Sequence, residues 1–175
     1  MKLLFAGFGG QGILFAGKFL AYCGMLAGKQ VSWLPSYGPE MRGGTANCGV
    51  ILSDSPIGSP LVNDPDVLAA MNLPSLDKFE ASAAAGAKVF IDSSLISRKL
   101  IREDVKVFYI PATELAYEYE LKGLANMIMV GKILRETDLF TTELIRSAMG
   151  KTVSERKKDL FDANLKAIEL GRSTV

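Results

Sequence analysis

A short apolar segment that leads directly into a glycine-rich turn is the feature that most constrains the fold of this chain. Lys2–Ala6 is apolar after its first residue, and four glycines then follow within Gly7–Gly12. Apolar residues continue from there along Gly10–Gly28 with the spacing of a buried helix. A buried strand, a tight turn and a helix, in this order, are typical of the start of an α/β domain.

The same alternation of strand and helix patterns continues along the chain. The turn residues Asp54-Ser55-Pro56 predict a hairpin, and a hairpin would make the sheet mixed. Strands are expected at 2–6, 30–34, 46–53, 57–62, 67–71, 88–91 and 105–110, with a loop over 35–45. Helices are expected at 10–28, 73–85, 112–121, 125–136, 142–149 and 155–170. We therefore predict one domain over residues 1–175, a three-layer α/β/α domain with a central mixed, mostly parallel sheet.

The C-terminal third of the chain is predicted to be helical. Phe161, Leu165 and Ile168 form one apolar stripe in the last helix, which we expect to cover the sheet. Gly150 and Gly171 stand where the last two helices are expected to stop, because glycine favours the position just after a helix.

Missing residue types exclude several kinds of chemistry. The chain of 175 residues has no histidine, which excludes Ser-His and Cys-His catalysis and imidazole ligation of metals. Its two cysteines, Cys23 and Cys48, are too few for a four-cysteine iron–sulfur cluster, and we expect both to be packed as small apolar residues. Asp92 follows a predicted strand and is interpreted as a turn or helix-cap residue.

The charge balance argues against nucleic acid and membranes as partners. There are 20 Lys and Arg residues against 19 Asp and Glu residues, so a strong basic footprint for nucleic acid is not expected. Lys18 and several glycines interrupt the apolar N-terminal stretch, which disfavours a membrane span. We expect a cytoplasmic protein.

The glycine turn also matches a dinucleotide-binding pattern. Gly7-Phe8-Gly9-Gly10-Gln11-Gly12 satisfies G-x-G-x-x-G between a strand and a helix. A ribose-binding carboxylate should follow about 20 residues later, but the first acidic residue in that region is Glu40. A stand-alone nucleotide-binding α/β enzyme that uses Gly7–Gly12 remains the alternative interpretation.

The loop after the second predicted strand is the most distinctive stretch of the chain. It contains Tyr37, Glu40, Arg42, Gly43 and Gly44. These residues form either an ordinary solvated turn or a rigid loop that presents Tyr37 and Arg42 to a partner or an anion, since the arginine fork suits carboxylates and phosphates. If strands 2–6 and 30–34 are parallel neighbours, this loop and the glycine turn lie at the same edge of the sheet.

Several motifs together resemble one family. They are, in order, Gly9–Gly12, Tyr37–Gly44, Ile57–Pro60 and Pro65–Leu68. The chain is similar to the gamma subunit of 2-oxoacid:ferredoxin oxidoreductases, and to domain III of the single-chain pyruvate:ferredoxin oxidoreductase. The resemblance covers most of residues 3–135. The R-G-G-T form of the loop is more similar to the 2-oxoglutarate type than to the pyruvate type.

The resemblance implies a cofactor-free subunit of a larger enzyme (EC 1.2.7 class). That enzyme would oxidatively decarboxylate a 2-oxoacid, transfer the acyl group to coenzyme A and pass electrons to ferredoxin. Thiamine diphosphate, magnesium and iron–sulfur clusters would lie on alpha, beta and ferredoxin-like delta subunits, and the isolated chain would be inactive. No catalytic or metal-binding residue is assigned. The expected binding or interface residues are Gly9, Gly10, Gln11, Gly12, Tyr37, Glu40, Arg42, Gly43 and Gly44.

Overall fold

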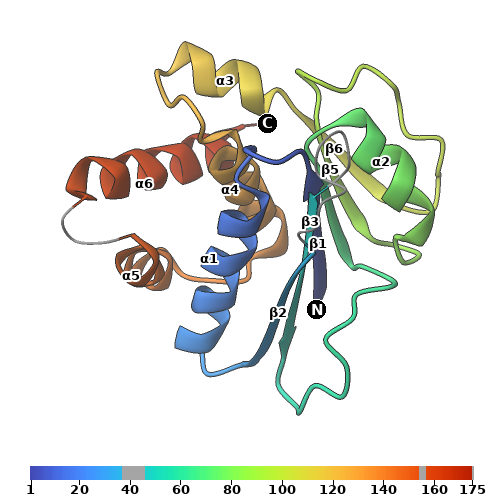
Figure 1. The fold of residues 1–175 in the computed structure, drawn as a ribbon, viewed down its shortest axis with the longest axis horizontal. Helices are drawn as coiled ribbons and strands as arrows, with labels where there is room; N and C mark the ends of the chain where they lie inside the picture. The colour runs from blue at the N-terminus through green and yellow to red at the C-terminus, as the bar shows by residue number, and fades with distance from the viewer. Residues whose placement is uncertain (37–45, 154–156, 175) are drawn as a thin grey trace.

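A six-stranded sheet forms the centre of the computed structural model, which describes residues 1–36, 46–153 and 157–174 (Figure 1). The strands lie in the order β2-β3-β1-β4-β5-β6. Their bounds are β1 Lys2–Gly7, β2 Gln30–Ser36, β3 Ala46–Ser53, β4 Val67–Ala70, β5 Lys88–Asp92 and β6 Lys106–Ile110. The alternation of apolar strands and helices in the sequence therefore produces the expected central sheet.

One reversed strand makes the sheet mixed. β3 is antiparallel to both of its neighbours, β1 and β2, whereas β1, β4, β5 and β6 are parallel to one another. The predicted hairpin is wrong, because residues 57–62 form no strand. Gly58 and Pro60 explain the difference, since glycine weakens a strand and proline cannot donate a ladder hydrogen bond. β1 and β2 point the same way, but β3 lies between them, so the condition that they are parallel neighbours is not met.

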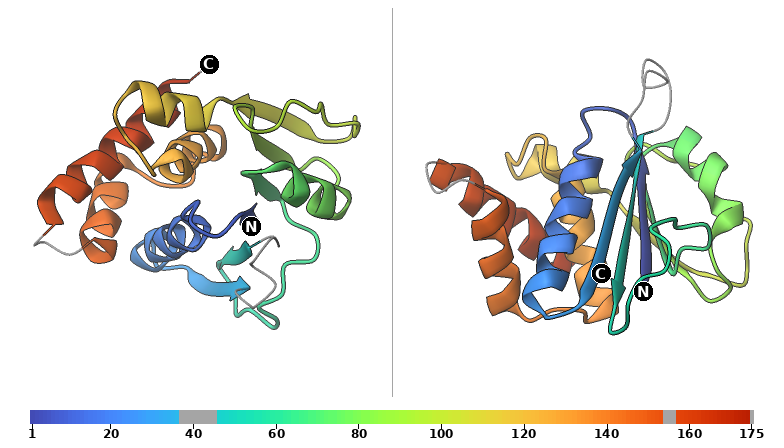
Figure 2. Two further views of the ribbon diagram at one scale, coloured as in Figure 1. Left: turned by 45° about the horizontal axis from the view of Figure 1, so that its top comes forward. Right: turned by 60° about the horizontal axis from the view of Figure 1, so that its bottom comes forward.

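Helices cover both faces of the sheet, as predicted (Figures 1 and 2). Apolar residues of α1, α3 and α4 pack on one face, and those of α2 pack on the other. The helices are α1 Ile13–Leu26, α2 Leu73–Phe79, α3 Ala112–Glu118, α4 Ala125–Thr137, α5 Thr142–Thr152 and α6 Lys158–Ser173, with a 3-10 turn at Glu80–Ser82. None of the helices in the described ranges has the length and apolar content needed to cross a membrane.

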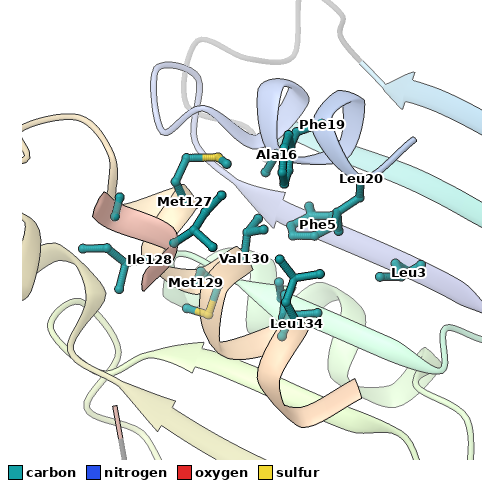
Figure 3. Packing of buried hydrophobic residues seen from close by; sticks show 14 of the residues in the cluster. Leu3, Phe5, Ala16, Phe19, Leu20, Met127, Ile128, Met129, Val130 and Leu134 are labelled. Atoms are coloured by element: carbon teal, nitrogen blue, oxygen red, sulfur yellow. The ribbon is translucent and has the colours of Figure 1, made fainter. Parts of the chain in front are cut away.

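Strand β1 contributes to the core on both sides of the sheet. Leu3 and Phe5 belong to the larger apolar cluster with α1 and α4, whereas Leu4 belongs to the cluster on the α2 side. Figure 3 shows Phe5 in the larger cluster, where side chains from β1, α1 and α4 converge. This alternation follows from the two-residue period of a strand, and it explains why the N-terminal segment is apolar at every position after Lys2.

Helix α6 is an outer helix and does not cover the sheet. It packs against α4 and α5, so the sequence-based expectation is wrong on this point. Ile168 is buried, but Phe161 and Leu165 are only partly buried. The stripe is apolar because it faces other helices.

The two expected helix stops also lie inside helices. Gly150 is within α5, and Gly171 is within α6. At the crossing of α4 and α6, Gly131 and Gly171 face each other so closely that a Cβ on either glycine would overlap a backbone carbonyl of the other helix. Gly171 is therefore required for helix packing, and it does not end the helix.

We predict that Gly171→Ala destabilises the fold strongly. The added methyl group would overlap the carbonyl oxygen of Ile128, and separating the helices should cost about 3 kcal/mol or more. Gly150→Ala is the matched control, because the nearest atom to its new Cβ is in the Phe161 ring at 4.0 Å. That substitution should raise stability by up to about 1 kcal/mol through helix propensity. Urea denaturation of both variants checks this; equal stabilities would contradict the close crossing.

Candidate functional site

The glycine turn between β1 and α1 adopts a conformation that requires glycine. Gly10 and Gly12 have φ angles of 92° and 71°, in the left-handed region that other residues rarely adopt. Gly12 is also the N-cap residue of α1, and a Cβ at this position would overlap the side-chain amide of Asn126. The pattern singled out in the sequence is therefore a tight strand-to-helix turn.

The Gln11 side chain connects this turn to the neighbouring strand. Its Oε1 accepts a hydrogen bond from the backbone N–H of Phe8 at 2.6 Å, and a longer one from Asn72 Nδ2 at 3.3 Å. Its Nε2 donates to the carbonyl oxygen of Met71 at 2.9 Å. Asn72 caps α2 through Ser75 N–H at 2.9 Å. Gln11 thus positions the turns that follow β1 and β4 relative to each other.

Asn126 is a second positioning residue, and the sequence analysis missed it. It is 4% exposed, and its Nδ2 donates to the carbonyl oxygen of Gly12 at 3.0 Å. Its Oδ1 is buried and has no hydrogen-bond partner among the described residues. The only signal in the sequence is one amide within the apolar run 125–130, which does not reveal a partner 114 residues away.

The strand pairing brings three strand ends to one edge of the sheet. Gly7 of β1 pairs with Ala46, and Ser36 of β2 pairs with Asn47, so the start of β3 lies between the ends of β1 and β2. The glycine turn and the C-terminal end of β2 therefore lie at the same edge of the sheet, the edge formed by strand ends. The predicted loop residues, Tyr37, Glu40, Arg42, Gly43 and Gly44, lie outside the described residues.

A hollow of about 310 Å³ adjoins the glycine turn at this edge. Gly10 and Gln11 line one side, and Thr113 and Tyr117 of α3 line another. Among its described lining residues Lys122 is the cation, and no carboxylate is present. A second hollow, of about 250 Å³, is lined by Phe8, Gly9, Gly10, Gly12, Ile13, Leu14, Phe15 and Ala46. These surfaces suit the binding of an apolar or anionic group; their described residues supply no general base.

Asp92 lies at a turn and accepts hydrogen bonds near the start of α3, which agrees with its interpretation as a turn or helix-cap residue. Its carboxylate is fully buried and accepts hydrogen bonds from Ser94 N–H at 3.1 Å and from the Thr113 hydroxyl at 2.5 Å. A longer bond comes from Thr113 N–H at 3.3 Å. These bonds connect the end of β5 to the start of α3, which accounts for a buried acidic residue without assigning it a reaction.

Both cysteines are buried, as expected. Burial raises the pKa of each thiol to about 12, for Cys23 in α1 and for Cys48 in β3. Thiols with raised pKa values hold little thiolate, the form that reacts and binds metals. Within residues 1–36, 46–153 and 157–174, no three Cys, Asp or Glu side chains gather as a metal site. The described residues therefore do not fit an iron–sulfur cluster or a divalent metal.

Comparison with known families decides the classification. The model of the family described as pyruvate ferredoxin/flavodoxin oxidoreductase matches residues 2–174. The chain belongs to this family. The resemblance inferred from the glycine turn and the later motifs is thereby confirmed, and it extends through the C-terminal helices.

The relatives of this chain are named after different substrates. The chain is 41% identical to the ketoisovalerate oxidoreductase subunit VorA of Methanothermobacter marburgensis, over 98% of this chain and 36% of that protein. It is 35% identical to the 2-oxoglutarate synthase subunit KorC of Methanocaldococcus jannaschii, over 97% of this chain and 91% of that protein. The chain spans about a third of the length of the VorA relatives.

Solved structures of the family share the fold. The keto/oxoacid ferredoxin oxidoreductase gamma subunit from Geobacter sulfurreducens superposes with a TM-score of 0.82, at 27% identity and over 97% of this chain and 95% of that one. A 2-oxoglutarate:ferredoxin oxidoreductase from Magnetococcus marinus gives a TM-score of 0.86 at 23% identity, over 99% of this chain and 30% of that one. This chain therefore has the same fold as the gamma subunit from Geobacter sulfurreducens.

We predict that Gln11→Ala lowers the free energy of unfolding by about 1–2 kcal/mol, because it leaves Phe8 N–H and the Met71 carbonyl without their side-chain partner. Gln30→Ala is the matched control, since the Gln30 side chain is exposed. Chemical denaturation measures both. Equal stabilities would show that Gln11 does not hold the two turns together.

We also predict that the buried thiols make stability fall at alkaline pH. Their folded pKa is about 12, so they stay neutral in the folded protein while unfolded thiols ionise above about pH 8.5. The contribution is fully present below that pH and is lost as pH rises toward 12. By pH 10 the loss should be on the order of 1–2 kcal/mol per thiol. Urea denaturation at pH 7 and pH 10 should show a smaller decline in a Cys23→Ala/Cys48→Ala variant than in the wild type.

Proposed function

We propose that this chain is the gamma component of a 2-oxoacid:ferredoxin oxidoreductase. Its partners would be the alpha and beta subunits of the same complex. A ferredoxin-like delta subunit would pass electrons to ferredoxin. The whole of residues 1–175 would act as one unit that corresponds to domain III of the single-chain pyruvate enzymes. The complex would work in the cytoplasm.

One observation carries this proposal. The gamma subunit from Geobacter sulfurreducens matches this chain over almost the full length of both proteins, in sequence and in fold. KorC, a subunit of 2-oxoglutarate synthase, likewise matches over nearly all of its own length. The family model covers residues 2–174, so the glycine turn, the sheet and the C-terminal helices all support the same assignment.

We place the cofactors of the reaction on the partner subunits. The described residues include two buried, poorly ionised thiols and no cluster of metal ligands. Thiamine diphosphate, magnesium and iron–sulfur clusters would therefore be held elsewhere in the complex, with coenzyme A as the co-substrate. This chain would contribute shape and hydrogen bonds to a shared site.

The proposed contribution comes from the edge where β1 and β2 end. Gly9, Gly10, Gln11 and Gly12 lie there, and the loop with Tyr37, Glu40, Arg42, Gly43 and Gly44 follows β2 in the sequence. Arg42 would meet an anionic group of coenzyme A or of the substrate, Glu40 would orient Arg42, and Tyr37 would supply apolar contact.

We propose 2-oxoglutarate as the substrate, on the strength of the R-G-G-T loop and the KorC relatives. The VorA relatives favour a branched 2-oxoacid as the competing candidate. A stand-alone nucleotide enzyme is disfavoured, because no ribose-binding carboxylate follows the glycine turn at the expected distance; the first acidic residue after the turn is Glu40.

The test is to purify the chain with its co-expressed partner subunits and to measure acceptor reduction. We expect coenzyme A-dependent turnover with 2-oxoglutarate, slower turnover with pyruvate and 2-oxoisovalerate, and none from the isolated chain. Arg42→Ala should leave the melting temperature unchanged but raise KM for coenzyme A or 2-oxoacid about tenfold or weaken assembly. Turnover or bound nucleotide in the isolated chain would overturn the proposal. A preference for 2-oxoisovalerate would correct the substrate alone.

A further inference from the structure

A second surface, distinct from the glycine turn, lies between helix α1 and the edge strand β2 (Figures 1 and 2). A hollow of about 440 Å³ is lined there by Lys18, Ala21, Tyr22, Met25, Lys29, Gln30, Val31 and Trp33. Asp54 adjoins this hollow, because its carboxylate pairs with the ammonium of Lys29 at 2.8 Å. We call the lining residues together with Asp54 the α1–β2 patch.

The middle of the α1–β2 patch is apolar and exposed. Met25 is 60% exposed and Trp33 is 39% exposed. Tyr22 lies one turn before Met25 on the same face of α1, since residues three apart are neighbours on a helix surface. Scattered apolar residues on a surface need no explanation, but a tryptophan and a methionine around one hollow are typical of the centre of a protein interface.

The charges of the α1–β2 patch lie toward its two ends. Lys18 has no ion pair among the described residues, and its ammonium lies 5.9 Å from the centroid of the Tyr22 ring. Toward the other end, the Asp54 side chain is 90% exposed although it pairs with Lys29. Helix α1 rises about 12 Å between position 18 and its last residue, Leu26, and Lys29 follows that end. The patch thus has a cation at one end and an accessible carboxylate at the other.

This order of groups is complementary to itself. In an interface with a two-fold axis perpendicular to the patch, the same patch of each copy faces the other, turned end to end. The apolar middle then meets the apolar middle, and Lys18 of each copy lies opposite Asp54 of the other. A carboxylate has two oxygens, so Asp54 can accept hydrogen bonds from its own Lys29 and from the second Lys18. Every lysine of the patch then has a carboxylate partner.

The edge strand β2 leaves room for such a partner. It pairs with β3 on one side and with no other strand of the described residues. An unpaired edge promotes association unless the chain blunts it. Pro35 has no N–H to donate, so we expect side chains, more than a main-chain ladder, to make the contact.

We propose that the α1–β2 patch is the surface through which two copies of this chain associate about a two-fold axis. Tyr22, Met25 and Trp33 form the apolar centre of the interface, and two ion pairs between Lys18 of one copy and Asp54 of the other form its ends. The inference goes beyond the proposed function, since it gives the complex two gamma components that contact each other. It does not depend on which 2-oxoacid is used.

The first test is sedimentation equilibrium of the full chain over a range of concentrations, where we expect a reversible dimer. Met25→Glu should raise the dissociation constant of this dimer at least about tenfold, because two carboxylates would meet near the two-fold axis. Lys18→Glu and Asp54→Lys should each raise it about tenfold, because each places like charges opposite each other. The effect of these two variants should shrink in about 1 M salt, where charges are screened over about 3 Å.

Mixing the two charge variants is the decisive measurement. In a mixed dimer of Lys18→Glu with Asp54→Lys, the new carboxylate at position 18 faces the new ammonium at position 54, and the two native side chains face each other at the other end. The mixture should therefore associate about tenfold more tightly than either variant alone. A pair of copies in any other arrangement gives no such rescue.

Two matched controls separate a local effect from a general one. Ile101→Glu introduces a charge at an apolar residue that is 82% exposed near the opposite edge strand. Lys166→Glu reverses an exposed charge on α6. Neither control should change the dissociation constant. All variants should keep the melting temperature of the wild type, because the altered side chains reach the surface.

The outcomes are distinguishable. If the wild-type chain is monomeric at every soluble concentration, or if the mixed variants fail to associate, the inference is overturned. If the wild-type chain is monomeric and Met25→Glu weakens its binding to the co-expressed alpha and beta subunits, a different subunit occupies the patch and the inference is likewise wrong. The proposed function stands in each of these cases, because coenzyme A-dependent turnover of a 2-oxoacid tests it and self-association does not.

Discussion

The antiparallel strand β3, inserted between β1 and β2, is the constraint on which the rest of the architecture depends. Because β3 runs against both neighbours, β1 and β2 point the same way and end at the same edge. The glycine turn that follows β1 and the end of β2 therefore lie at the same end of the sheet, with the start of β3 between them. The same insertion places β2 at the margin of the sheet, where no other strand of the described residues pairs with its outer side. One topological feature thus determines both where β2 ends and why β2 is an edge strand.

Much of the sheet could be predicted from the sequence, because apolar runs bounded by glycine are a local signal. The run Lys2–Ala6 and the turn after it were placed correctly for this reason. The segment 57–62 was not, since its apolar ends resemble a strand while Gly58 and Pro60 prevent pairing. The predicted mixed sheet is confirmed. Its antiparallel strand is β3, which pairs with β1 and β2, whereas the sequence predicted a hairpin between residues 46–53 and 57–62.

Only the glycine turn, the part of the candidate site that is continuous in the sequence, could be predicted. The glycines of the turn are adjacent in the sequence, and their role follows from backbone conformation. Asn126 donates a hydrogen bond to Gly12 from a helix that is far away in the sequence, and no local sequence pattern reveals such a partner. Gly171 was misread for a related reason: glycine either ends a helix or lets another helix approach, and only tertiary structure distinguishes the two.

The end of helix α6 is held through the main chain of the residues at its terminus. Lys132 donates to the carbonyl oxygen of Thr174 at 2.9 Å, and Arg135 donates to those of Arg172 and Thr174 at 2.9 and 2.7 Å. Every amino acid has a carbonyl oxygen, so these contacts do not depend on which side chains stand at positions 172 and 174. The attachment therefore tolerates other side chains at positions 172 and 174, whereas it depends on the two cations of α4, Lys132 and Arg135.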